Sequence, residues 1–286
     1  MRICNVDGRL SVRVGDGIVD VEAASSGRFG PSVQEAYPRW DDFVSWVESA
    51  CPITPTAAAP EPSRIGPPVP APRQIFAIGA NYRDHAAESG LDLPPRPMVF
   101  TKFPGSITGP FAEIETPPGQ VDWEVELVVV IGRRARWVSK ADAWSHVAGL
   151  TVGQDLSERV LQISPPTPQQ FNLGKSYEGF APIGPELVTI DEFDDVSDIE
   201  IFCELSGEQV QKARTSDLIF TVPVIISFLS KVLPLLPGDL IFTGTPSGVG
   251  WARSPQRFIQ PGETLVTRAQ GIGEMRNTFV PGRGAL

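Results

Sequence analysis

Three carboxylates carry the clearest chemical pattern in the sequence. Glu124 and Glu126 lie two residues apart at the head of an apolar, β-branched segment that ends at Ile131. Side chains alternate between the two faces of a strand, so both carboxylates should share one face and repel each other unless a cation lies between them. Asp155 follows a second apolar segment, 149–152. Three carboxylates without a nearby Cys or His predict a hard oxygen site for Mg²⁺, Mn²⁺ or Ca²⁺, and a solvated acidic face is the alternative.

A histidine with a carboxylate three residues later is the second candidate. His85 and Glu88 would share one face of a helix over 84–88, where the carboxylate could orient an imidazole that takes a proton from water. An ordinary solvated His–Glu pair is the alternative. The other histidine of the chain, His146, is interpreted as structural.

A glycine-rich segment and a lysine could complete a site for an anionic ligand. The segment 244–250 follows a strand-like stretch, and its amides and the Thr245 hydroxyl could bind an anion or a carbonyl oxygen. No lysine follows the last glycine, which excludes a nucleotide-binding P-loop, and a plain tight turn is the alternative. Lys175 could neutralise a substrate carboxylate or a developing enolate, although a single lysine usually faces solvent.

These side chains must be positioned by a β-rich fold. Gly and Pro supply 27 and 29 of the 286 residues, so the chain must turn often. Only 141–146 and 222–233 have a helical pattern after residue 75, too few helices for a doubly wound α/β fold. We therefore expect a mixed, β-rich α+β fold of the sandwich or barrel type. Its predicted strands are 75–78, 98–101, 124–131, 149–152, 199–204, 240–243, 265–268 and 275–280.

Composition divides the chain into three parts. Residues 1–51 predict a small N-terminal α+β unit, with strands at 2–6, 10–14 and 18–21 and a helix around 40–47. Residues 52–73 contain eight prolines, which favours an extended connector. Residues 74–286 form the large domain that holds every candidate site residue.

Charge and cysteine content limit the classes of partner. The net charge of −10 disfavours a nucleic-acid partner or an anionic membrane surface. The longest strongly apolar run is far shorter than a membrane span, and no secretory signal begins the sequence. Three widely spaced cysteines (Cys4, Cys51 and Cys203) match neither a disulfide framework nor a zinc site. We therefore expect a cytoplasmic protein.

Five sequence blocks, taken in their order along the chain, resemble the fumarylacetoacetate hydrolase superfamily over about residues 75–282. The first four are Asn81-Tyr-Arg-Asp-His-Ala-Ala-Glu88, Asp122-Trp-Glu-Val-Glu-Leu127, Gln154-Asp-Leu-Ser-Glu-Arg159 and Gly174-Lys-Ser176. The fifth runs from Pro237 through the glycine-rich segment to Gly250.

The resemblance implies a β-sandwich roll with a small N-terminal unit, usually assembled as a homodimer. It implies that Mg²⁺ or Mn²⁺ is held by Glu124, Glu126 and Asp155, and that catalysis uses His85, Glu88 and Lys175. Substrate-binding positions implied in the same way are Tyr82, Lys102, Arg159, Gln162, Gly244 and Thr245.

The implied activity is metal-dependent hydrolysis of a C–C bond in a β-diketo acid of the acylpyruvate or fumarylpyruvate type. Water activated by the His–Glu pair would attack, and the metal would stabilise the enolate that leaves. The alternatives are oxaloacetate decarboxylation, or isomerisation or dehydration of a 2-keto or 2-hydroxymuconate-type diacid. A non-catalytic binding protein that retains the fold is the rival from another class.

Overall fold

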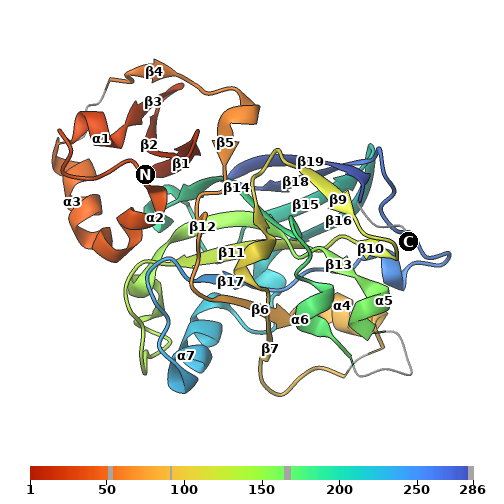
Figure 1. Cartoon of the computed structure of the whole chain (residues 1–286). Coiled ribbons are helices and arrows are strands. Elements are labelled where there is room, and N and C mark those ends of the chain that lie inside the picture. The colour runs from red at the N-terminus through yellow and green to blue at the C-terminus, as the bar shows by residue number, and fades with distance from the viewer. Residues whose placement is uncertain (51–53, 91, 164–168, 283–286) are drawn as a thin grey trace.

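Two sheets form the framework of the computed structural model, which describes residues 1–50, 54–90, 92–163 and 169–282 (Figure 1). The larger sheet has the order β4-β3-β2-β1-β14-β12-β11-β17-β6-β7, with β5 paired to β1 and β8 to β14. Its strands are β1 (Arg2–Val6), β2 (Arg9–Val14), β3 (Gly17–Asp20), β4 (Ala57–Ala58), β5 (Ile65–Gly66), β6 (Ile75–Gly79), β7 (Met98–Thr101), β8 (Ile107–Thr108), β11 (Val125–Ile131), β12 (Val147–Gln154), β14 (Ala181–Val188) and β17 (Leu240–Phe242).

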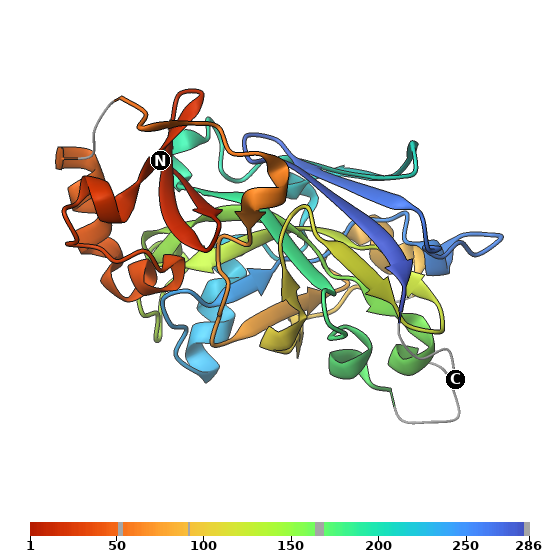
Figure 2. The same cartoon turned by 45° about the horizontal axis from the view of Figure 1, so that its top comes forward.

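The second sheet has five strands in the order β16-β15-β18-β19-β9. These strands are β9 (Glu113–Thr116), β15 (Glu200–Leu205), β16 (Glu208–Arg214), β18 (Thr264–Ala269) and β19 (Gly273–Pro281). A short ladder joins β10 (Val121–Asp122) to β13 (Ser157–Glu158). Figure 2 shows the second sheet packed across one face of the first. Parallel pairing of β17 with β6 within an otherwise mostly antiparallel sheet confirms the expected mixed β-rich fold.

Helices are few and mostly short in the described residues. The α-helices are α1 (Val21–Ala24), α2 (Val33–Ala36), α3 (Trp40–Ala50), α4 (Arg83–Glu88), α5 (Arg159–Ile163), α6 (Phe171–Gly174) and α7 (Val222–Val232). The 3₁₀ turns are η1 (Tyr37–Arg39), η2 (Pro62–Arg64), η3 (Pro104–Ser106), η4 (Ala143–His146), η5 (Ile190–Glu192), η6 (Thr215–Asp217) and η7 (Gly250–Ala252). The helix expected at 222–233 is α7. The prediction of a helix around 141–146 is wrong. Only the four residues of η4 are helical there, with 3₁₀ geometry, and β12 begins directly after them.

Strand β11 explains how the fold holds a polar site inside an apolar core. All seven of its residues are buried, and alternate side chains enter two different clusters. Leu127 and Val129 pack with residues of the second sheet, whereas Val128 and Val130 pack toward the N-terminal residues. Antiparallel pairing of β11 with β12 sets Val125 opposite Gln154. This pairing brings Glu124 and Glu126, next to Val125, close to Asp155, next to Gln154.

The N-terminal strands extend the large sheet. They lie close to the predicted segments, and β1 pairs with β14 through Arg2 and Val188. Trp40 and Phe43 of the predicted helix pack in the same apolar cluster as Val128 of β11. Figure 1 shows this unit, in red and orange, at one end of the sheet, and α4, α5 and α6 near the other.

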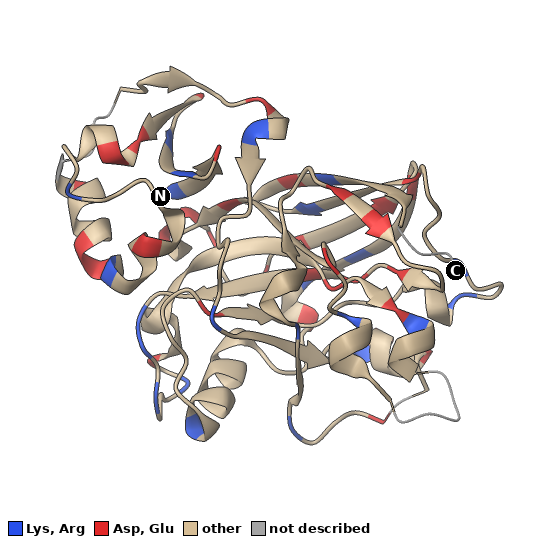
Figure 3. Cartoon of the chain, viewed as in Figure 1, with Lys and Arg blue, Asp and Glu red and all other residues tan. Residues whose placement is uncertain are grey.

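Charged residues avoid the centre of the large sheet. Figure 3 shows Lys, Arg, Asp and Glu along the N-terminal unit, the second sheet and the helices, whereas β6, β7, β12 and β17 contain none. Cys4 and Cys203 are buried free thiols, and Cys51 lies outside the described residues. Across the described ranges, no helix is both long and apolar enough to cross a membrane.

Candidate active site

The three predicted carboxylates form one buried group at the ends of β11 and β12. Glu124, Glu126 and Asp155 are at most 6% exposed, and each offers an oxygen within 4.8 Å of the others. A backbone hydrogen bond of 2.9 Å from the Asp155 amide to the Glu124 carbonyl fixes the two chain segments together. The alternative of a solvated acidic face is excluded by this burial.

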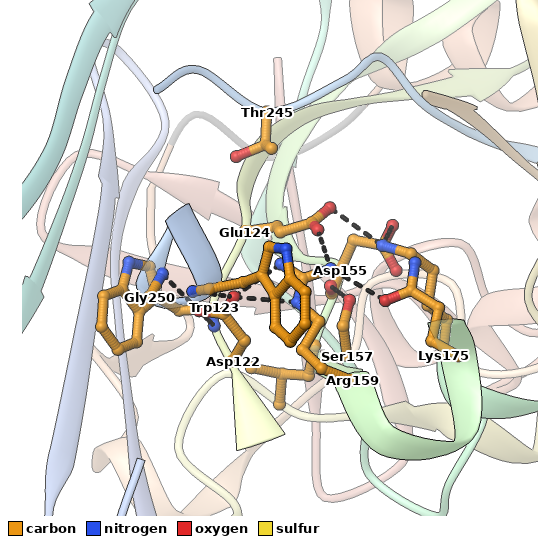
Figure 4. A network of polar contacts seen from close by, with 12 residues as sticks. Asp122, Trp123, Glu124, Asp155, Ser157, Arg159, Lys175, Thr245 and Gly250 are labelled. Atoms are coloured by element: carbon orange, nitrogen blue, oxygen red, sulfur yellow. Dashed lines mark hydrogen bonds and ion pairs between the residues drawn. The ribbon is translucent and has the colours of Figure 1, made fainter. Parts of the chain in front are cut away.

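Three cations neutralise two of these carboxylates. Lys175 Nζ lies 2.9 Å from Glu124 Oε2 and 2.7 Å from Asp155 Oδ2. Arg159 Nη1 lies 2.8 Å from Glu124 Oε1, and Lys102 Nζ lies 2.7 Å from Asp155 Oδ1. Figure 4 shows the Glu124 side chain directed to Lys175, with Thr245 above it. Burial alone would raise the pKa of Glu124, but Lys175 and Arg159 outweigh it and lower that pKa to about 2.

Glu126 is the carboxylate that the cations leave uncompensated. It accepts a hydrogen bond of 2.6 Å from the Gly244 amide, and no lysine or arginine of the described residues forms an ion pair with it. Burial and the charges of Asp155 and Glu124 raise the pKa of Glu126 well above its usual range. A buried oxygen-only group in which one carboxylate has no cationic partner fits a hard divalent cation.

His85 and Glu88 form the predicted pair on α4. His85 Nδ1 lies 2.7 Å from Glu88 Oε1, and Glu88 Oε2 accepts a hydrogen bond of 2.9 Å from the Gly248 amide. The helix is thus attached to the glycine-rich segment. Because Nδ1 faces the carboxylate, Nε2 is the imidazole nitrogen left for water or substrate.

One cavity of about 370 Å³ joins these groups. It is lined by seven of the predicted residues: His85, Glu124, Glu126, Arg159, Gln162, Lys175 and Thr245. Gln162 accepts a hydrogen bond of 2.9 Å from Arg159, and Thr245 lies 2.8 Å from the Gln211 side-chain amide. The volume is within the ~300–1,000 Å³ range of small-molecule sites.

Three predicted substrate-binding residues lie behind the cavity wall. Lys102 is fully buried, and its ammonium group donates to Asp155 and to the backbone carbonyls of Leu156 and Lys175. Gly244 contributes its amide to Glu126, and Tyr82 borders a neighbouring cavity. Substrate contact by Tyr82, Lys102 and Gly244 therefore stays a prediction, and their observed contacts support the site from behind.

Asp122 is a residue of the site to which the sequence analysis gave no role. Its carboxylate is fully buried and accepts hydrogen bonds of 2.9 and 2.7 Å from Arg159 Nε and Nη2. It also accepts from the amides of Gly250 and Trp251, at 2.7 and 3.0 Å. Asp122 therefore holds Arg159 and the end of the glycine-rich segment in register (Figure 4). The sequence signal that could have identified Asp122 as a site residue is its position two residues before Glu124.

The class of protein follows from these features: a mixed β fold that buries three carboxylates suited to a divalent cation beside a His–Glu pair is typical of a metal-dependent enzyme. The chain belongs to the fumarylacetoacetate hydrolase family, as its motifs predicted. The family model described as "Fumarylacetoacetate (FAA) hydrolase C-terminal" matches residues 74–280.

Relatives and solved structures agree with this assignment. Human oxaloacetate tautomerase FAHD2A, mitochondrial, is 40% identical over 215 residues, which are 74% of this chain and 68% of that protein. A crystal structure from Mycobacterium smegmatis has a TM-score of 0.93 at 53% identity and covers 98% of this chain and 99% of that one. Maleylpyruvate hydrolase from Sphingobium sp. SYK-6, solved with manganese(II) and pyruvate, has a TM-score of 0.78 at 27% identity, covering 99% of this chain and 100% of that one.

Proposed function

We propose that this protein is a divalent-metal-dependent hydrolase that cleaves the C–C bond between the acyl carbonyl carbon and the neighbouring methylene carbon of an acylpyruvate. The observation that carries the proposal is that the His85 imidazole and the Glu124 and Glu126 carboxylates line the same cavity. An enzyme of this kind must activate water and stabilise an enolate at neighbouring points, and these groups are suited to the two tasks.

Binding of the 2-oxo acid end would use the inner part of the cavity. Glu124, Glu126 and Asp155 would hold Mg²⁺ or Mn²⁺, which would supply Lewis-acid stabilisation of negative charge on the keto-acid oxygens. Lys175 lies against the same carboxylates and adds positive charge where the enolate develops. The Thr245 hydroxyl, which also lines the cavity, accepts from the Gln211 amide and can donate to a substrate oxygen.

Proton transfer would run through His85. Nε2 takes a proton from water, and the hydroxide adds to the acyl carbonyl carbon while Glu88 stabilises the imidazolium through Nδ1. The C–C bond then breaks, its electron pair passes to the pyruvate enolate, and the enolate carbon is reprotonated. One water is consumed for each acylpyruvate, and the products are a carboxylic acid and pyruvate.

Oxaloacetate is the substrate of the second candidate function. The 40% identity to the human oxaloacetate tautomerase favours it, because that relative matches over most of the large domain. In tautomerisation, His85 would move a proton between the enol oxygen and the carbon next to the carbonyl carbon, and no water would be added. Decarboxylation, or isomerisation or dehydration of other keto diacids, would use the same cation and lysine without hydrolysis.

The deciding experiment is turnover of acetylpyruvate, fumarylpyruvate and oxaloacetate with Mg²⁺ or Mn²⁺ and again with a chelator. Release of equal amounts of acetate and pyruvate from acetylpyruvate, lost on chelation, supports the hydrolase. Keto–enol conversion or pyruvate release from oxaloacetate, with both acylpyruvates untouched, would replace it by the second candidate. The homodimer and the cytoplasmic location expected from the sequence stay predictions, to be checked by light scattering and by fractionation of cells.

A further inference from the structure

The cavity has a second part whose chemistry the proposed function does not use. Seven apolar side chains line it, namely Ile78, Met98, Phe100, Ile163, Phe171, Val249 and Trp251. Ile78 and Val249 are buried, whereas Met98 and Trp251 are 42% and 36% exposed, so this apolar part runs from the buried side of the cavity to its solvent-facing side. These side chains come from β6, β7, α5, α6, η7 and the residue that precedes η7.

Phe100 marks the boundary between the charged and apolar parts. Lys175 Nζ lies 5.0 Å from the centre of the Phe100 ring, and the rings of Phe100 and Phe171 are 6.0 Å apart. A substrate whose keto-acid end meets Lys175 therefore projects its other end along these aromatic rings. Gly79 assists, because a Cβ atom at this position would collide with the Met98 methyl group that lies over the strand.

No free cation faces this apolar part among the described residues. The cationic lining side chains are Arg159 and Lys175, and both are paired with carboxylates at the inner end. His85 is held by Glu88. A second substrate carboxylate placed here would lose hydration and gain no ion pair.

We infer that the acyl group of the substrate is apolar, aliphatic or aromatic, and that Phe100, Phe171 and Met98 determine this specificity. The inference rests on the proposed function, because it assumes that the 2-oxo acid end occupies the inner part. The sequence motifs do not distinguish acylpyruvates with an apolar acyl group from dicarboxylic substrates such as fumarylpyruvate. The inference favours the apolar acylpyruvates.

The test compares two ligands that differ at the far end. The binding of 2-oxo-4-phenylbutanoate and of 2-oxoadipate to the full chain is measured by calorimetry with Mn²⁺ present. We expect the phenyl ligand to bind at least about tenfold more tightly, the size of a modest hydrophobic contact. Equal or tighter binding of 2-oxoadipate would overturn the inference alone. Failure of both ligands to bind would overturn the proposed function as well.

Substitutions on α6 give the matched control. Phe171→Arg should reverse the preference toward 2-oxoadipate, because it places a cation on the apolar wall. Leu173→Arg, on the same helix but half exposed and outside the cavity lining, should leave the ratio unchanged. Met98→Lys provides a second substitution on a different element. An unchanged ratio in folded Phe171→Arg and Met98→Lys would show that the acyl group lies elsewhere.

Discussion

Two buried carboxylates of the large sheet show how a structural charge differs from a functional one. Glu186 on β14 and Glu126 on β11 are 3% and 1% exposed. Glu186 contacts two guanidinium groups, from Arg2 at 3.0 Å and from Arg13, and lies near the Cys4 thiol. Glu126 receives one backbone amide and faces two other carboxylates.

The difference lies in the balance of charge. A buried carboxylate is tolerated when cations and hydrogen bonds replace its water, as they do at Glu186. Near Glu126, the three cations form their ion pairs with Glu124, Asp155 and Asp122, so among the described residues Glu126 has no cationic partner. Such a charge raises the free energy of the folded protein unless a ligand completes the site. The uncompensated carboxylate therefore indicates where the cation belongs.

Substitution at Glu126 should have the largest effect. Glu126→Gln keeps the shape and the hydrogen bond from Gly244 but removes the charge, so metal-dependent turnover should fall by about a thousandfold or more. The metal-free variant should unfold at the same or a higher temperature than the wild type, because glutamine, unlike Glu126 with its raised pKa, has neither to take up a proton nor to bury an unpaired charge when the protein folds. Steady-state kinetics and thermal melting check both points. Activity within tenfold of the wild type would contradict the role of this carboxylate.

Removal of the His85 imidazole should have the second-largest effect on activity. His85→Ala should lower acylpyruvate hydrolysis by about 10²–10⁴-fold, the usual contribution of a positioned acid–base group. Decarboxylation of oxaloacetate, if present, needs no attacking water and should fall much less. Parallel assays of the two reactions on the same preparation measure the difference. An equal fall in both would show that the division of roles between His85 and the cation is wrong.

A smaller effect is expected at the carboxylate that orients this histidine. Glu88→Gln can still accept from the Gly248 amide but no longer stabilises an imidazolium, so kcat should fall by about tenfold. The KM should change little, since Glu88 is not part of the cavity lining. Comparison of kcat with KM separates this positioning role from a loss of substrate contact, which would instead raise KM.

The smallest effect on activity is expected at the structural carboxylate. Glu186→Gln leaves Arg2 and Arg13 without their anion and should lower the free energy of unfolding by about 2 kcal/mol, less than a fully buried pair because both arginines are partly exposed. Turnover should stay within twofold of the wild type. Denaturant unfolding and kinetics measure the two quantities, and a large loss of turnover with normal stability would mean that the two clusters are not functionally distinct.

Local patterns in the sequence predicted the carboxylates and the His–Glu pair better than they predicted the contacts and elements that hold these residues in place. Glu124, Glu126 and Asp155 were predictable because strand alternation and strand ends determine their positions. The i, i+3 spacing likewise predicted the contact between His85 and Glu88. The apolar periodicity of α7 predicted a helix at nearly the correct residues.

Long-range contacts account for what the sequence did not predict. Asp122 reaches Arg159, 37 residues away, and Phe100 meets Phe171 across two elements. Helices α5 and α6 have five and four residues, too few for a periodic signal. The extension of the large sheet by β1 depends on its pairing with β14, which lies far along the chain and was not among the predicted strands.

The most direct test of this account is a calorimetric titration of Mn²⁺ into the metal-free wild type and into Glu126→Gln and Glu186→Gln. The account predicts a single saturable site in the wild type and in Glu186→Gln, and at least a hundredfold weaker binding in Glu126→Gln. Wild-type affinity in folded Glu126→Gln, or no binding to the wild type, would contradict the claim that an uncompensated carboxylate defines the metal site.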